Sequence, residues 1–250
     1  MALLMRSNNP VLRSTPFAGA PALTLGGTMT VDGTVNKTGL LMICVAVPAV
    51  WTWNLVRGGN LPLAMLLLVA GVIGGLVVAL LTVWKKQWSP VTAPLYALLE
   101  GLVLGGVSAL SEASYPGIAI NAVLLTIGTL VALLVAYRAG VVRATEGFKR
   151  GIFAATGGIL LLYVVTMILG LFHVQIPLIY GAGPIGIVFS LVVVVIAALN
   201  LVIDFDLIET GAKMGAPKYM EWYGAFALLV TLIWLYMEIL RLLSKLRSRR

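Results

Sequence analysis

Residues 62–84 read PLAMLLLVAGVIGGLVVALLTVW, a run that contains no charged side chain. An α-helix rises about 1.5 Å per residue, so about 20 residues cross the roughly 30 Å hydrocarbon core of a bilayer. Inside lipid the backbone must satisfy its own hydrogen bonds, and a helix does so within a single segment. This run is therefore predicted to be a transmembrane helix.

Six further runs of similar length and composition accompany it. The 250-residue chain is 60% hydrophobic and 10% charged, with a mean hydropathy of +1.05. A soluble domain carries about 25% charged residues, because its surface must stay hydrated. We therefore predict an all-α membrane protein, a bundle of seven transmembrane helices, and exclude a soluble enzyme. The predicted spans are residues 39–56, 62–84, 91–111, 118–137, 151–172, 184–204 and 222–243.

The segments outside the spans indicate the ends and the orientation of the chain. Residues 1–38, rich in Ser, Thr, Asn, Pro and Gly, are interpreted as an N-terminal tail, 39–243 as the transmembrane domain and 244–250 as a basic C-terminal tail. Lys and Arg are concentrated in the N-terminal tail and in the second, fourth and sixth connections, which predicts a cytoplasmic N-terminus. The basic C-terminus disagrees with seven full crossings, so the sequence leaves open whether the last helix crosses completely.

Six of the nine carboxylates lie inside or beside predicted spans. A carboxylate in hydrocarbon costs on the order of 2.5–3.5 kcal/mol on insertion scales. Such residues therefore usually face a partner, a water-filled cavity or an ion path. The six are Glu100, Asp204, Asp206, Glu209, Glu221 and Glu238.

Each isolated acid has a structural and a functional interpretation. Glu100 could hydrogen-bond a neighbouring helix or belong to an ion path, and the glycines that follow it would let another helix approach closely. Glu238 could pair with Arg241, three residues on in the same helix, or bind an ion. Glu209 and Glu221 could be solvated groups at helix ends.

Asp204, Asp206 and Glu209 form the densest acidic group. Asp206 and Glu209, three apart, share a helix face, while Asp204 points elsewhere. Carboxylates packed together repel one another, and protonation of one relieves the repulsion. Carboxylate oxygens are also the ligands that calcium prefers. The group is therefore a candidate site for protons or calcium, with Asp204 and Asp206 as the candidate calcium ligands, and a solvated helix end is the alternative.

Motifs for other chemistry are mostly absent from the sequence. One cysteine excludes an internal disulfide, and a single histidine, His173, excludes a zinc site that needs two. There is no phosphate-binding loop, no arginine-rich voltage-sensor repeat and no Gly-x-Gly-Asp protease motif. We therefore predict no catalytic site and no cofactor. The net charge of +8 fits the cytoplasmic connections of a membrane protein, and we expect no nucleic-acid partner.

Four stretches of the chain carry a family resemblance: MTVDGTVNKTG at 29–39, YALLEG at 96–101, DFDLIE at 204–209 and APKYMEW at 216–222. Together they resemble the Bax inhibitor motif family, and within it the bacterial YccA-like branch. The resemblance covers nearly the whole chain and implies a calcium-permeable, pH-sensitive leak in the bacterial cytoplasmic (inner) membrane. It also implies that the other six helices surround a central last helix.

The resemblance also implies a gate made of two Asp side chains, one on each of the last two helices, which bind protons and close the path. Asp206 matches the family's Asp on the sixth helix. The family's usual spacing leads to Thr231 on the last helix, whereas the family's sequence pattern on that helix resembles the residues around Glu238. These two positions are about 10 Å apart along a helix. If Glu238 lies that far from Asp206, the two carboxylates cannot share a proton. Asp204 or Glu209 could then take the place of the second Asp.

Together these observations predict a calcium leak channel gated by membrane-embedded carboxylates, with Glu100, Asp204, Asp206 and Glu238 along the path. The alternative is a non-conducting regulator that binds a membrane-bound protease or another membrane protein, as family members do, through the N-terminal tail. The expected partners are the lipid bilayer, protons and calcium, with calcium as the permeant or bound ion.

Overall fold

The computed structural model describes residues 27–172, 181 and 183–249. Within these residues, seven helices are long and apolar enough to cross a membrane, and each overlaps one of the seven predicted spans. The predicted all-α fold is therefore confirmed. A short 3₁₀ turn, η2 (Lys86–Trp88), precedes the third of them. The seven are α1 (Val31–Arg57), α2 (Leu61–Trp84), α3 (Ser89–Ser114), α4 (Ile118–Arg138), α5 (Glu146–Leu171), α7 (Pro184–Lys213) and α8 (Met220–Ser248).

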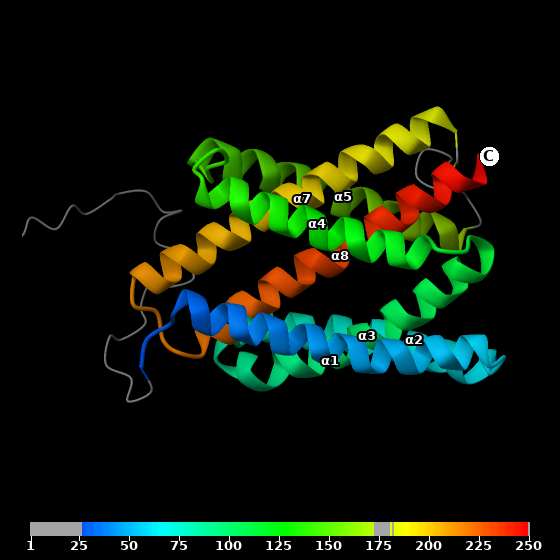
Figure 1. Ribbon diagram of the computed structural model, residues 1–250, viewed down its shortest axis with the longest axis horizontal. Helices are drawn as coiled ribbons and strands as arrows, with labels where there is room; N and C mark the ends of the chain where they lie inside the picture. The colour runs from blue at the N-terminus through cyan, green and yellow to red at the C-terminus, as the bar shows by residue number, and fades with distance from the viewer. Residues whose placement is uncertain (1–26, 173–180, 182, 250) are drawn as a thin grey trace, which may run out of the picture.

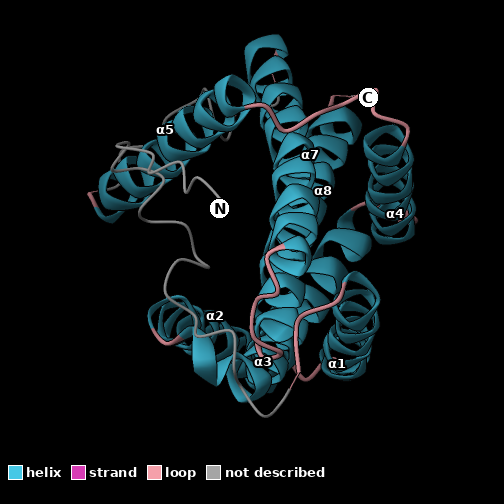
Figure 2. Ribbon diagram, turned by 90° about the vertical axis from the view of Figure 1, so that its left-hand side faces the viewer, coloured by secondary structure: helices cyan, strands magenta, loops and turns pink. Residues whose placement is uncertain are grey.

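The last helix, α8, lies at the centre of the bundle. Helices α1, α3, α4 and α7 pack against it (Figures 1 and 2). The span of α8 is 56% buried, against 17% for those of α1 and α5. In Figure 1, α8 runs the length of the bundle and ends opposite the start of α1. Four of the six other helices pack against α8, which confirms its predicted central position, and α8 is long and apolar enough for the full crossing that the sequence left open.

Several helices extend beyond the apolar runs that predicted them. The Thr30 side chain accepts a hydrogen bond from the Gly33 N–H, 3.0 Å away, and so caps α1. Serine and threonine are favoured at this position because they satisfy a free backbone donor. Consequently α1 starts at Val31, inside the predicted tail, and α8 likewise continues to Ser248. Residues 1–26 of the predicted tail, and His173, lie outside the described residues.

Glycines bring α3 into close contact with α1. A Cβ atom on Gly101 would fall on the Val45 carbonyl oxygen, and one on Gly105 would fall on that of Ala49. Small residues four apart allow two helix backbones to approach in this way. The close approach predicted for the glycines after Glu100 is thus confirmed, and the neighbouring helix is α1.

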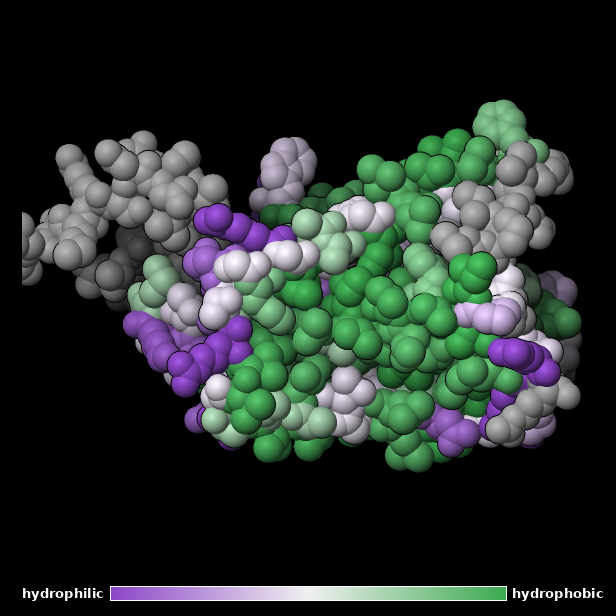
Figure 3. Space-filling model, turned by 90° about the horizontal axis from the view of Figure 1, so that it is seen from above, coloured by the Kyte–Doolittle hydropathy of each residue, from purple (hydrophilic) through white to green (hydrophobic). Residues whose placement is uncertain are grey.

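The outer surface of the bundle is apolar along its middle. Figure 3 shows a hydrophobic band with hydrophilic residues at both ends. Large apolar side chains on this surface are widely exposed, for example Ile43 (66%), Leu66 (65%) and Leu161 (66%). Such a surface suits lipid, so the chain is an integral membrane protein. The end of the bundle at which α1 begins is called the entry end below.

Candidate functional site

The acidic residues singled out from the sequence lie at separate places along the bundle. Among the described residues, no group of three or more His, Cys, Asp and Glu side chains could together hold a metal ion. Each acid has its own partners, and these partners differ in charge and in burial.

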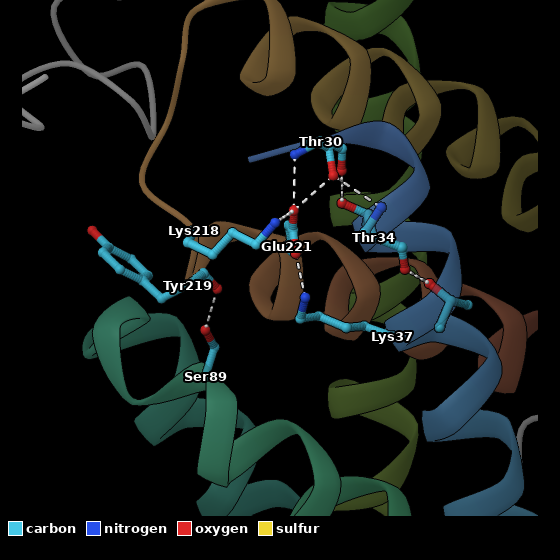
Figure 4. A network of polar contacts seen from close by, with 9 residues as sticks. Thr30, Thr34, Lys37, Ser89, Lys218, Tyr219 and Glu221 are labelled. Atoms are coloured by element: carbon cyan, nitrogen blue, oxygen red, sulfur yellow. Dashed lines mark hydrogen bonds and ion pairs between the residues drawn. The ribbon is translucent and has the colours of Figure 1, made fainter. Parts of the chain in front are cut away.

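Glu221 lies at the entry end and joins the start of α8 to the start of α1 (Figure 4). Its Oε1 accepts hydrogen bonds from the Thr30 N–H at 2.9 Å and the Thr30 hydroxyl at 2.8 Å. The Lys218 ammonium lies 2.8 Å from the same oxygen, and Lys37 donates to Oε2. Glu221 itself is completely buried. We call these four residues the Glu221 clamp.

The Glu221 clamp corrects one sequence interpretation. Glu221 is not a solvated group at a helix end, because the start of α1 covers it and supplies its donors. Backbone contacts strengthen the same junction, since the Met29 N–H donates to the Ala216 carbonyl at 2.7 Å. The signal was present in the sequence, because Thr30, Lys37, Lys218 and Glu221 all lie in stretches that carried the family resemblance.

Asp206 and Glu209 share one face of α7, as predicted, and both line a cavity near the entry end. Asp206 is paired with Lys149 of α5 at 2.7 Å, not with a residue of α8. Glu209 accepts a hydrogen bond from the Tyr137 hydroxyl at 2.6 Å and one from Lys213. Because both carboxylates are already paired with cations, neither is left as a bare negative charge.

Asp204 faces away from that cavity, as predicted, and has a different environment. Its neighbour is the hydroxyl of Thr231 on the central helix α8. The Asp204 Oδ2 atom is buried and has no hydrogen-bond partner among the described residues. Buried polar atoms are normally satisfied, so an unsatisfied one calls for an explanation such as an unseen ion or water. Asp204 is therefore the acid of α7 best placed to interact with a cation or a proton.

Glu238 lies further along α8 and is paired within its own helix. Arg241 donates to both carboxylate oxygens at 2.9 Å, so the structural interpretation of this residue is confirmed. The Tyr163 hydroxyl of α5 donates to Glu238 Oε1 at 2.9 Å and accepts a hydrogen bond from Arg241 at 2.6 Å. Of these three residues, Glu238 is the buried one, with 1% of its surface exposed.

Glu100 lies between α2 and α3, apart from the acids of α7. It hydrogen-bonds with Tyr96 of its own helix. A Cβ atom on Gly75 of α2 would lie 2.9 Å from Glu100 Oε1, so the carboxyl group fills the space that this glycine leaves. The Tyr96 ring in turn packs edge-on against Phe226 of α8, with ring centroids 5.0 Å apart. Glu100 therefore reaches the central helix through Tyr96.

A row of polar residues on α5 was missed by the sequence analysis. Lys149, Thr156 and Tyr163 recur every seven residues, which places them along one face of a helix. Lys149 pairs with Asp206, Thr156 accepts a hydrogen bond from Asn200 of α7 at 2.9 Å, and Tyr163 joins the Glu238 pair. The seven-residue spacing was the available signal, and it shows how α5 attaches to α7 and α8.

A family model described as "Bax inhibitor 1 like" matches residues 9–248. No curated protein and no solved structure matches the chain.

Proposed function

The chain belongs to the Bax inhibitor 1-like family, and on that premise we propose that it is a pH-sensitive, calcium-permeable leak gated by carboxylates around its central helix. The observation that carries the proposal is the buried Oδ2 atom of Asp204, which lies beside Thr231 of α8 and has no hydrogen-bond partner among the described residues. Because none of the described residues donates to this oxygen, it is free to attract a hard cation such as calcium.

The positions of the acids along α8 support a path beside this helix. Glu221 and Glu238 are roughly 25 Å apart along the helix axis, and Thr231 lies between them. Asp204, next to Thr231, would therefore interact with an ion in the interior of the membrane. Because Asp206 is neutralised by Lys149, we assign the gating role to Asp204. Asp206 and Glu238 would line the path as members of ion pairs.

Protonation of Asp204 supplies the proposed dependence on pH. The charged carboxylate attracts a cation, and the protonated one no longer does, so the leak should be smaller at low pH. In the family's arrangement an acid of the last helix would share the proton, and here the Thr231 hydroxyl stands in its place. We further propose, from the distribution of Lys and Arg, that the entry end faces the cytoplasm of a bacterium.

The test is calcium flux into dye-loaded liposomes that contain the purified protein, at pH 6 and pH 8. We expect wild-type flux to be larger at pH 8, and Asp204→Asn to lower it to the pH 6 level and abolish the pH dependence. Glu146→Gln, whose side chain is 68% exposed, is the matched control and should behave as wild type. An Asp206→Asn variant that alone abolishes the pH dependence would move the gate to Asp206.

The second candidate is a non-conducting regulator that binds a membrane-bound protease or another membrane protein. The observation that favours it is the polar segment ahead of α1, which joins the bundle where Thr28 pairs with Pro217. Deleting residues 1–26 leaves this pairing and the Thr30 cap in the chain. A leak should survive the deletion, whereas regulation through the tail should not. Folded wild-type protein that gives no flux above empty liposomes at either pH would refute the leak.

A further inference from the structure

A cavity of about 800 Å³ opens near the entry end between α1 and α4. This volume is in the range of about 300–1,000 Å³ that is usual for small-molecule sites. Its lining includes the apolar side chains of Phe205 and Ile208 of α7 and Leu228 of α8. In Figures 1 and 2, α1 and α4 lie apart along α8, so its side walls belong to two different helices.

The mouth of the cavity lies beside surfaces that face lipid. Val35 of α1 lines the cavity and is nevertheless 57% exposed. On the opposite wall, Leu134 lines the cavity and its neighbour Val135 is 61% exposed. Exposed apolar side chains on a transmembrane helix suit contact with acyl chains, so both walls of the cavity adjoin surfaces suited to lipid.

The charged residues of the cavity lie at the same end as the α4–α5 connection. Two carboxylates line it, and both are paired with cations: Asp206 with Lys149, and Glu209 with Lys213. Arg138 and Arg143 also line it, and neither has a carboxylate partner among the described residues. The Arg143 Nε donates to the Gly140 carbonyl at 3.2 Å, which leaves its terminal nitrogens for a ligand.

We propose that this cavity binds an anionic glycerophospholipid of the surrounding bilayer. The phosphate lies against Arg138 and Arg143, and an acyl chain enters between α1 and α4 toward Leu228. Arginine is suited to the phosphate because its guanidinium presents several N–H donors in one plane. Basic pockets between transmembrane helices recognise anionic head groups in this way. The inference is independent of the leak proposed above.

The test is native mass spectrometry of the full-length protein in detergent, with phosphatidylglycerol or phosphatidylcholine carrying the same acyl chains. We expect the wild type to retain phosphatidylglycerol in preference to phosphatidylcholine. The double variant Arg138→Gln/Arg143→Gln should reduce this preference about 30-fold, as two cations near an anionic lipid imply. The double variant Lys85→Gln/Lys86→Gln removes the same charge outside the cavity and should keep the preference. Thermal unfolding checks that each variant is folded.

A second variant tests the apolar half of the site. Leu134→Trp fills the space between α1 and α4 and should lower the binding of both lipids while leaving both arginines in place. If the double arginine variant does not fold, Arg143→Gln alone decides the charged half, with an expected loss of about five-fold.

Four results would overturn the proposal. The first is a wild type that binds both lipids equally, and the second is a lysine control that loses as much preference as the arginine variant. In the third, glycerol phosphate competes as well as the intact lipid does, which would make the site one for soluble phosphates. In the fourth, lipid binds only after residues 1–26 are deleted, which would make the tail the occupant of the cavity.

Discussion

Replacing Gly33 by alanine tests the Glu221 clamp, because two effects of opposite sign meet at this position. Inside a helix, alanine is more stable than glycine by about 0.5–1 kcal/mol. A methyl group on Gly33, however, would fall on the Glu221 carboxylate, which Thr30 and Lys37 hold in place. The carboxylate must therefore move, and hydrogen bonds to it must break.

The expected loss of stability in Gly33→Ala follows from the hydrogen bonds to Glu221 that are lost. A hydrogen bond to a charged group contributes about 1.5–3 kcal/mol, and Lys218, whose side chain is 47% exposed, can follow the carboxylate or turn to water. Losing one or two bonds and gaining helix propensity gives a net destabilisation of about 2–4 kcal/mol. For a domain of this size, that lowers Tm by roughly 5–15 °C.

The control is Gly39→Ala in the same helix. No atom lies within 4 Å of a Cβ built on Gly39, so only the propensity effect acts and Tm should rise by roughly 1–4 °C. Both variants are compared with wild type by thermal unfolding in one detergent, followed by circular dichroism. If Gly33→Ala raises Tm as Gly39→Ala does, the carboxylate is not held where the structure places it, and the reasoning fails.

Two further variants test the packing of the bundle by the same measurement. Glu221→Gln removes the negative charge that Lys37 and Thr30 bind and should lower Tm by roughly 5–15 °C. Its control, the exposed Glu146→Gln, should change Tm by less than about 2 °C. Equal shifts in Tm for the two variants would contradict the Glu221 clamp. Gly101→Ala, which places a methyl group on the α1 backbone, should cost about 1–3 kcal/mol. Gly128→Ala has open space and should leave Tm unchanged or slightly raised, so a larger loss there would refute the packing argument.

Much of the fold is local and can be predicted from the sequence. Each span is an apolar run long enough to cross lipid, and a helix satisfies its backbone within that run, so no knowledge of its neighbours is needed. The Glu238–Arg241 pair is equally local, because residues three apart on a helix are neighbours whatever surrounds them. The shared face of Asp206 and Glu209 follows from the same geometry.

Partners from distant parts of the chain could not be predicted in this way. Hydropathy places Glu221 near the start of a helix, but only the docking of α1 buries it under Thr30, 191 residues away. Asp204 and Asp206 are two residues apart, yet one faces Thr231 of the central helix and the other meets Lys149. The partner that each acid meets depends on how far its helix is rotated about the helix axis, and on which neighbouring helix packs against the face that carries the acid. The sequence by itself determined the seven apolar spans and the acids within them. The packing of helices decided which acid pairs with a cation and which has an oxygen with no hydrogen-bond partner among the described residues.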